Sequence, residues 1–440
     1  MSNSQEPTHR TAVVASAILP DGAVLEMVSR SEDQRTAFLI HRDGAIAEHR
    51  EFDIPGVGRA TPYSQTNNLI AHSVVLFPSG VADYDSQVAL LAEVRNFIHR
   101  YADLSESFEE LASLYVLLSW VYDRFNAMPY LRLKGDYGSG KSRCLQTIGS
   151  ICYKPMFVSG ASTVSPMFRI IDAFRGTLIL DESDFRFSDE RAEIIKILNN
   201  GNAVGFPVLR SEATPTKEFN PRAFAVFGPK VIATRREFDD QALESRCITE
   251  IMSGLPPRAD IPLSLPAGFA NEACALRNKL LMYRFNNHAQ YGSVSERQDS
   301  AIEARVAQIY QPLLAVAPDE AARERVLAHA RIQTGALRAV RGASVESQLL
   351  DTLYVMRQAG APFYVRDITT RFADKYGADF DRPVTARWVG GQLRKRLSLV
   401  TLKSHGMYVV PVTEQAKLDA LFARYATEDD AVDMGTMGTF

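Results

Sequence analysis

The spacing of hydrophobic and polar residues changes several times along the chain, and each change marks a predicted boundary. In the first part, short apolar runs alternate with turn signals such as "DG" at 21–22 and "PSG" at 78–80. This alternation is typical of strands joined by tight turns and predicts a small β-rich domain over residues 1–85. Over about 86–126 the apolar residues recur at helical spacing, and Ser105 stands before a glutamate in the manner of a helix N-cap.

Apolar runs of strand length then alternate with helical stretches up to about residue 250, an order that predicts an α/β sheet. The predicted strands read "YLRLKG", "PMFVSG", "GTLILDE" and "PKVIAT". Together with the helices that precede it, this part is predicted to form one α/β domain over residues 86–250. Residues 251–342 have helical spacing and predict a helical domain.

The last folded part of the chain, residues 343–426, is predicted to be a separate unit. Three amphipathic stretches at 344–360, 364–377 and 385–399 predict helices, and the residues after them read as strand, turn and strand. The final residues, 427–440, are acidic and then rich in Gly, Thr and Met, a composition that predicts disorder.

Composition narrows the class of protein. The chain has 440 residues, of which 46% are hydrophobic, and a formal net charge of −3, so any nucleic-acid contact must come from local basic patches. Its four cysteines form no Cys-x-x-Cys pair, which argues against a zinc site and is typical of reduced thiols in the cytoplasm. No apolar run is long enough to span a bilayer, so we expect a cytoplasmic protein without a membrane partner.

A glycine-rich motif follows the first strand of the α/β region. Gly135, Gly138 and Gly140 precede Lys141-Ser142, the spacing of a loop in which backbone N–H groups and a helix N-terminus surround phosphate oxygens. In such a loop the lysine reaches the β- and γ-phosphates, and the serine hydroxyl binds Mg²⁺. We therefore expect ATP and Mg²⁺ to bind here.

An acidic pair, Asp181-Glu182, ends the apolar strand "GTLILDE". A buried parallel strand brings both carboxylates to the sheet edge at which the phosphates bind. We expect Asp181 to hold the Mg²⁺ and Glu182 to polarise the attacking water. A glutamate in this place favours ATP hydrolysis over binding alone, whereas Asp184 has no assigned role.

The next predicted strand, "PKVIAT", ends at Thr234, whose hydroxyl we expect between the acidic pair and the γ-phosphate. In this order of phosphate loop, acidic strand and polar strand end, residues 130–250 resemble the AAA+ ATPases. The resemblance implies an AAA+ core with a helical lid over residues 251–342 and assembly into a ring, expected to be a hexamer. It also implies an arginine that acts on the nucleotide of the neighbouring subunit, and Arg246 in "ALESR" stands at that position. The family more commonly has an asparagine where this chain has Thr234.

Other interpretations of these arginines stay open at this point. Arg235 and Arg236 are rivals for the same role. The alternative for Arg246 is a surface ion pair with Asp239, Asp240 or Glu244. In the predicted lid, Arg305 is a candidate for a second phosphate-sensing arginine, and its alternative is a solvated helix position paired with Glu303.

Residues 205–229 predict a β-hairpin inserted before the strand that ends at Thr234. Two apolar runs enclose a polar loop, and the arrangement resembles the hairpin that helicases of the mini-chromosome-maintenance type project into their central pore. Arg210, Lys217 and Arg222 are the candidates for contact with a DNA backbone. A plain surface hairpin is an equal alternative.

The C-terminal unit, with three helices and a strand pair, resembles a winged helix. Its last helix and strands have no acidic residue between 387 and 413, and the candidate DNA contacts are Arg387, Arg394, Lys395 and Lys403. The resemblance implies a helix in the major groove and a wing on the phosphates. The alternative is a protein-docking module.

The sequence therefore predicts a ring-forming ATPase with an AAA+ α/β core that acts on DNA and resembles replication helicases of phages and mobile elements. An ATP-driven helicase is the leading hypothesis. The second is a helicase loader or initiator, which binds DNA without unwinding it and recruits other replication proteins. The third is a protein remodeller that does not touch DNA, and the basic C-terminal surface argues against it.

Overall fold

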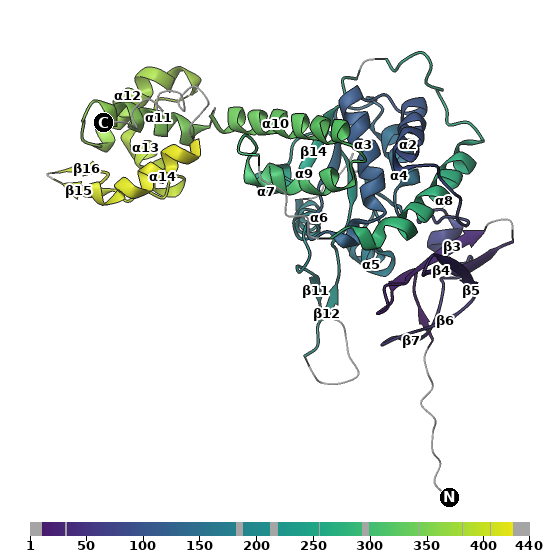
Figure 1. Cartoon of the computed structure of the whole chain (residues 1–440). Helices are drawn as coiled ribbons and strands as arrows, with labels where there is room; N and C mark the ends of the chain where they lie inside the picture. The colour runs from purple at the N-terminus through teal and green to yellow at the C-terminus, as the bar shows by residue number, and fades with distance from the viewer. Residues whose placement is uncertain are drawn as a thin grey trace, which may run out of the picture. The chain divides into compact units, whose positions relative to one another are not determined.

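The computed structural model describes residues 11–30, 33–181, 188–211, 219–254, 256–292, 299–342, 344–380, 382–404 and 406–425. The chain divides into two compact units, Met1–Ala330 and Arg331–Phe440, and Figure 1 labels many of their helices and strands. The predicted site residues Glu182 and Lys217, together with Asp184 and the tail at 427–440, lie outside the described residues. In the part of the chain that the structure describes, no helix is both long and apolar enough to cross a membrane.

The N-terminal strands form two small sheets, one with the order β2-β3-β4-β5 and one with the order β1-β7-β6. The strands are β1 Ala12–Val13, β2 Ser16–Ile18, β3 Val24–Arg30, β4 Arg35–Arg42, β5 Ala45–His49, β6 Phe52–Ile54 and β7 Gly58–Thr61. Asp43 and Gly44 join β4 to β5 with φ of 51° and 78°. Two consecutive positive φ values are what a two-residue hairpin turn requires, so this "DG" pair sets the strand pairing. A short helix, α1 Asn68–Ala71, follows.

A five-stranded parallel sheet forms the centre of the first unit, with the order β14-β8-β13-β10-β9. Its strands are β8 Tyr130–Lys134, β9 Met156–Ser159, β10 Leu178–Asp181, β13 Lys230–Thr234 and β14 Cys247–Ile251. Val231, Ile232 and Ala233 of β13 have no exposed surface, because helices cover both faces of a sheet of this kind. The predicted α/β sheet is confirmed, and β14 is a further strand that the sequence analysis did not identify.

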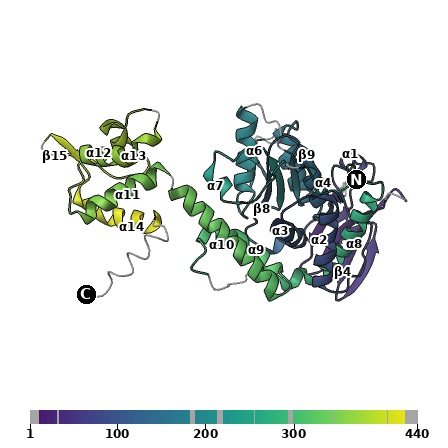
Figure 2. The same ribbon diagram turned by 90° about the horizontal axis from the view of Figure 1, so that it is seen from above.

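Helices that connect the strands lie on both faces of this sheet. They are α4 Lys141–Ile151, α5 Val164–Phe174, α6 Ser188–Asn200 and α7 Gln241–Glu244. The chain crosses from β8 to β9 in one direction and then crosses back, so right-handed connections place α4 on one face and α5, α6 and α7 on the other. Seen from above, α6 and α7 lie to one side of β8 and α4 lies to the other (Figure 2).

Further helices precede and follow the sheet. They are α2 Gln87–Tyr101, α3 Glu106–Ser119, α8 Phe269–Asn287, α9 Ala304–Val316 and α10 Glu320–Gly342. Helix α3 is buried from Phe108 to its end and packs against α2, α4 and α9. The Ser105 hydroxyl accepts the Phe108 N–H at 3.3 Å, so the predicted N-cap at Ser105 is confirmed.

A buried group of charged side chains ties the N-terminal sheets to the core and to α8. Glu26 on β3 accepts a hydrogen bond from Arg284 Nε at 2.8 Å and one from the Tyr153 hydroxyl at 2.6 Å. Glu26 also pairs with Lys154 at 3.2 Å, and Arg284 pairs with Asp123 at 2.7 Å. Each charge has an opposite partner, which offsets the cost of removing it from water. Burial nevertheless lowers the pKa of Lys154 to about 8.

The predicted hairpin is present, as β11 Val208–Arg210 paired antiparallel with β12 Arg222–Phe224. Lys230, the first residue of β13, contacts both chain segments that connect this hairpin to the core. Its ammonium donates hydrogen bonds to the carbonyl oxygens of Gly201, Val226 and Gly228 at 3.1, 3.0 and 3.0 Å. The first of these lies before β11 and the others follow β12, so one side chain joins both ends of the inserted segment. Burial lowers the pKa of Lys230 to about 7.

The second unit contains helices and one short β-hairpin around its own apolar core. Its elements are α11 Val345–Gln358, α12 Val365–Tyr376, α13 Ala386–Lys395, β15 Leu402–Ser404, β16 Met407–Val409 and α14 Gln415–Tyr425. Leu353, Phe372 and Leu393 are buried in its core. The three predicted helices and the strand pair are present, and α14 was not predicted. Short 3-10 turns in the two units are η1 Tyr122–Arg124, η2 His288–Gln290, η3 Gly377–Asp379 and η4 Val412–Glu414.

Candidate nucleotide-binding site

The glycine-rich loop connects β8 to α4 at the carboxyl edge of the sheet. Gly138 and Gly140 have φ of 79° and 85°, values that residues with side chains rarely adopt. At Gly135, an added Cβ would come within 2.9 Å of Met252 and Ser139. The three glycines therefore let the loop curl tightly over the N-terminus of α4, a form suited to a phosphate group.

Lys141 is the first residue of α4, and its ammonium lies inside the loop. It donates hydrogen bonds to the carbonyl oxygens of Gly135 at 2.7 Å and Asp136 at 2.5 Å, and to the Ser139 hydroxyl at 3.3 Å. Burial and the nearby charge of Arg235 lower the pKa of Lys141. All three acceptors are neutral oxygens, so the positive charge of the lysine is left for a phosphate.

Two oxygen atoms beside the loop are buried without a hydrogen-bond partner among the described residues, namely Asp181 Oδ1 and Thr234 Oγ1. The second carboxylate oxygen of Asp181 accepts a hydrogen bond from the Ser142 hydroxyl at 2.8 Å. Thr234 ends β13, which lies between β8 and β10 in the sheet, so its hydroxyl lies between the loop and Asp181. Native proteins rarely leave buried polar atoms unpaired, and these two therefore indicate a ligand.

The residues beside the loop fit Mg²⁺ as well as phosphate. Ser142 and Asp181 offer a hydroxyl and a carboxylate, and Mg²⁺ is usually held by one or two such oxygens together with water and phosphate oxygens. The unpartnered Oδ1 of Asp181 is an atom that such an ion would satisfy. The expected water-polarising residue, Glu182, lies outside the described residues.

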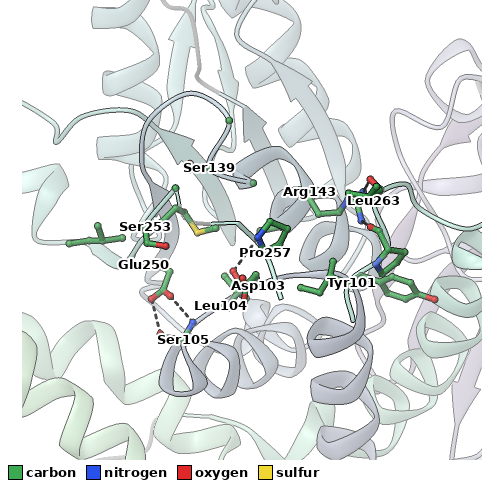
Figure 3. Close-up of a pocket in the computed structure, with 18 residues that line it drawn as sticks. Tyr101, Asp103, Leu104, Ser105, Ser139, Arg143, Glu250, Ser253, Pro257 and Leu263 are labelled. Atoms are coloured by element: carbon green, nitrogen blue, oxygen red, sulfur yellow. Dashed lines mark hydrogen bonds between the residues drawn. The ribbon is translucent and has the colours of Figure 1, made fainter. Parts of the chain in front are cut away.

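A pocket of about 450 Å³ opens beside the loop (Figure 3). Glu250, at the end of β14, accepts hydrogen bonds from the Ser105 N–H at 2.7 Å and the Ser105 hydroxyl at 2.9 Å. Arg143 of α4 donates to the carbonyl oxygens of Pro262 and Leu263 at 3.0 and 2.7 Å, which holds the segment after β14 beside the loop. The pocket has the size of a small-ligand site and adjoins the phosphate loop, so it is the candidate place for the nucleoside.

The sequence analysis missed this pocket. Its two walls, represented by Ser105 and Glu250, lie 145 residues apart in the chain. No motif marks either wall, and only the parallel pairing of β14 with β8 brings them together. One signal for the pocket was available in the sequence. The stretch "CITEI" directly follows Arg246 and could have been predicted as a further strand that extends the sheet.

Arg246 lies at the opposite, amino edge of the sheet. It directly precedes β14, whose first residue, Cys247, is in register with Tyr130 at the start of β8. The phosphate loop leaves β8 at the other end, after Lys134, so the length of the strand separates the two by roughly 13 Å. Arg246 is therefore remote from its own loop, as an arginine that serves a neighbouring subunit must be.

Arg246 is held by an asparagine and lies near Asp240, one of its three candidate ion-pair partners. Its guanidinium donates a hydrogen bond to the Asn199 side chain, and its Nε is buried without a partner in the described part of the chain. Glu244 instead pairs with the buried Arg132, and Asp240 caps α7. No described carboxylate lies within ion-pair distance of Arg246, although its positive charge helps to lower the pKa of the nearby Asp240.

Arg305 on α9 lies beside Arg246 and not beside the phosphate loop of its own chain. Burial and the charge of Arg246 lower the pKa of Arg305. Its side chain contacts Gln308 at 2.6 Å and Ser245 at 3.5 Å. Arg305 and Arg246 therefore lie together, away from the phosphate loop of their own chain.

The rival arginines lie at the other edge. Arg235 and Arg236 directly follow Thr234, at the carboxyl edge where the phosphate loop also lies. The Arg235 guanidinium lies 5.9 Å from the ring centroid of Tyr137 in that loop. Both therefore lie near the phosphate loop of their own chain, whereas Arg246 and Arg305 lie at the opposite edge of the sheet.

The hairpin arginines have partners within the chain. Arg210 pairs with Glu193 at 3.4 Å, and Arg222 lies 4.0 Å from Asp172. Each guanidinium also lies over a phenylalanine ring. The third candidate on the hairpin, Lys217, lies outside the described residues.

The basic surface of the second unit is exposed as the helix pattern predicts. Val389 and Leu393 on one face of α13 are buried. Arg394 donates a hydrogen bond to the Thr401 hydroxyl at 2.8 Å. The exposed candidates, none of which forms an ion pair with a described residue, are Arg387, Arg394, Lys395 and Lys403.

No protein-family model matches the chain, and no curated protein matches its sequence. Among solved structures, it is similar to the apo C-terminal region of NrS-1, at 8% identity and a TM-score of 0.38, over 88% of this chain and 96% of that one. It is also similar to the Cch helicase of SCCmec type IV, at 14% identity and a TM-score of 0.40, over 93% of this chain and 80% of that one. A full-length MCM homolog from Methanopyrus kandleri matches at 12% identity and a TM-score of 0.32, over 69% of this chain and 72% of that one.

Of these three, the Cch protein is described as an active helicase. Their low identities and TM-scores identify no activity for this chain. The proposals that follow rest on its own residues.

Proposed function

We propose that this protein is an ATP-hydrolysing, ring-forming DNA motor of the helicase type. The observation that carries the proposal is the pair of unpartnered oxygens, Asp181 Oδ1 and Thr234 Oγ1, beside the phosphate loop. Both are buried where a loop of this kind places the γ-phosphate and its metal ion. A nucleoside triphosphate with Mg²⁺ would satisfy both atoms at once.

Each residue of the site has a task in hydrolysis. Lys141 would exchange its loop carbonyls for β- and γ-phosphate oxygens, and Ser142 and Asp181 would hold Mg²⁺. Thr234 would donate a hydrogen bond from its hydroxyl to a γ-phosphate oxygen, and Glu182 would orient and polarise the attacking water. When bound, Mg²⁺ supplies positive charge that offsets the negative charge of the phosphates.

We assign the completion of the site to a second copy of the chain. Arg246 has a buried, unpartnered Nε at the edge of the sheet opposite its own loop, so it is suited to the nucleotide of a neighbour. Arg305 beside it would add a second positive charge to the same phosphate. Hydrolysis then requires assembly, for which a hexameric ring is the arrangement we propose.

DNA is the proposed substrate of the motor. The hairpin formed by β11 and β12 would contact one strand within the ring. The second unit, as a winged helix, would hold duplex DNA through the exposed basic side chains of α13 and β15. The loader or initiator is a second candidate, favoured by one observation: Arg210 and Arg222 already lie near carboxylates of the same chain.

Strand displacement on forked DNA with ATP tests the proposal. We expect the wild type to unwind and Lys141→Ala to lose both ATP turnover and unwinding, because the loop loses its cation. The combined substitution of Arg210, Lys217 and Arg222 by alanine should hydrolyse ATP but unwind poorly. An active ATPase that displaces no strand from forks of either polarity would support the loader, and an inactive wild-type ATPase would refute both.

A further inference from the structure

A second cavity, of about 670 Å³, lies at the amino edge of the central sheet. Its walls include turns that precede successive strands: Tyr122, Asp123 and Arg124 precede β8, and Arg175 precedes β10. The connections on both sides of the β11–β12 hairpin, part of β2, and the side chains of Tyr153, Arg284 and His288 complete the lining. The nucleotide site lies at the opposite edge of the same sheet, so this cavity is a separate site.

The charges in this cavity do not cancel. Asp123 is the one carboxylate among its lining residues, and it is already paired with Arg284 at 2.7 Å and bonded to His288 at 3.2 Å. Arg124 donates a hydrogen bond from its Nε–H to the Tyr291 carbonyl oxygen at 2.7 Å. Its two terminal nitrogens are left to bind an anion. Neither Arg124 nor Arg175 forms an ion pair with a described residue. The cavity therefore offers two positive charges to an anion.

Arg175 has a backbone conformation that favours glycine. Its φ is 49° at the C-cap of α5, and the Tyr122 hydroxyl binds its carbonyl oxygen at 3.0 Å. A left-handed conformation is unfavourable for a residue with a side chain, and such residues gather at functional sites.

An apolar wall faces these charges. Phe206 has 64% of its surface exposed and Val204 has 52%, and both lie between α6 and β11. Phe227 lines the same cavity, with its ring 5.8 Å from that of Tyr122. Flat apolar surface beside separate cations matches a chain of phosphates that carries unpaired bases.

We propose that this cavity binds single-stranded DNA, with phosphates at Arg124 and Arg175 and an unstacked base on Phe206. The proposal rests on the proposed action of the protein on DNA and adds a binding site at the base of the hairpin. A duplex does not fit this chemistry, because its bases are stacked inside and cannot reach an aromatic side chain. The site therefore distinguishes a separated strand from a duplex.

Binding of a dye-labelled oligothymidylate to the full-length protein, followed by fluorescence anisotropy at several salt concentrations, tests the proposal. The variants are Phe206→Ala and the double variant Arg124→Ala with Arg175→Ala. The matched controls are Arg35→Ala and Val57→Ala. Arg35 is the exposed first residue of β4, and Val57 is exposed in the turn between β6 and β7. Basal ATP turnover and oligomeric state are measured on every variant.

Phe206→Ala should weaken binding by at least about fivefold, the effect of losing one stacked base. The double variant should bind more weakly, and its slope of log affinity against log salt should fall by about 1.4, since each phosphate contact to a single strand contributes roughly 0.7. The controls should bind as the wild type does. Basal ATP turnover should be unchanged in all of them, because none of these residues lies at the nucleotide site.

Each other outcome overturns the proposal in a different way. If the wild type binds the oligonucleotide and both cavity variants bind it equally well, the cavity is not the site, and the proposed DNA motor is unaffected. If the wild type binds no single strand at all, the proposed function fails together with the site. If weaker binding accompanies a change of oligomeric state, the cavity is a contact between copies of the chain.

Discussion

Arg246 and Lys141 lie at opposite edges of one sheet, and this separation allows a test of their roles at the scale of single residues. We expect Arg246→Ala to bind ATP as the wild type does but to lose turnover by on the order of 10³-fold, the usual worth of an arginine supplied by a neighbour. Turnover and binding of a fluorescent ATP analogue measure the two effects. Arg35→Ala, an exposed arginine at the start of β4 in the N-terminal sheet, is the control and should leave turnover unchanged.

Mixing Arg246→Ala with Lys141→Ala subunits should restore part of the activity, because a mixed interface can combine one intact loop with one intact arginine. A parallel loss of ATP affinity in Arg246→Ala would instead place the arginine at the nucleotide of its own chain. If mixed rings regain no activity although mass measurement shows that they assemble, Arg246 does not act on a neighbouring subunit.

The unpaired hydroxyl of Thr234 predicts an uncommon combination of effects. Thr234→Val keeps the shape but removes a buried oxygen that has no partner among the described residues. Without nucleotide, the free energy of unfolding should be unchanged or higher by about 1 kcal/mol, while ATP turnover falls. Thr177→Val is the control, because the equally buried Thr177 hydroxyl donates to the Tyr153 carbonyl oxygen at 3.0 Å. That variant should be less stable, and a loss of stability in both would contradict the assignment.

At the scale of elements, strand β13 carries a buried lysine whose charge depends on pH. Burial lowers the pKa of Lys230 from 10.5 to about 7, so between these values the unfolded chain binds a proton that the folded chain does not. The free energy of unfolding should therefore rise with pH from about 7 to 9, by up to about 1.4 kcal/mol per pH unit from this group. Lys230→Met should be less stable overall, because buried carbonyl oxygens around it lose hydrogen bonds from the lysine amine, but its stability should rise less with pH.

Urea unfolding at several pH values measures this slope. Each unit contains one tryptophan, Trp120 or Trp388, so both proteins should carry Trp388→Phe to let Trp120 report on the first unit. Lys154, whose pKa burial lowers to about 8, contributes equally to both proteins and cancels in the difference. Identical slopes for the two proteins would show that Lys230 is not the titrating group.

Elements defined by local spacing were predictable, and those defined by distant contacts were not. The phosphate loop, the Asp181 strand end and the Thr234 strand end follow from glycine spacing and from short apolar runs, because a parallel sheet collects the carboxyl ends of its strands at one edge. The place of Arg305 was not predictable, since the packing of α9 on α3 decides which edge it reaches. The same holds for the nucleoside pocket and for the three carbonyl oxygens around Lys230, where no sequence motif is involved.

At the scale of the whole molecule, two surfaces are expected to bind different forms of DNA. The second unit should bind duplex, so changing Arg387, Lys395 and Lys403 to alanine should reduce the slope of log affinity against log salt by about 2.7, or roughly 0.9 for each phosphate contact. Anisotropy of a labelled duplex measures it. Arg396→Ala is the control, because Arg396 is already paired with Glu346 at 2.7 Å. An unchanged slope would favour a protein-docking role for this unit.

Strand β13 has consequences beyond its own stability, because its two ends belong to the two proposed sites of the first unit. Thr234 ends it beside the phosphate loop. Lys230 begins it, bound to the carbonyl oxygen of Val226, which also lines the second cavity. A coupling free energy between two ligands is symmetric. If ATP at one end of the strand raises the affinity for a DNA strand at the other, that DNA strand must raise the affinity for ATP by the same factor, so subunits that hold DNA fill with ATP first.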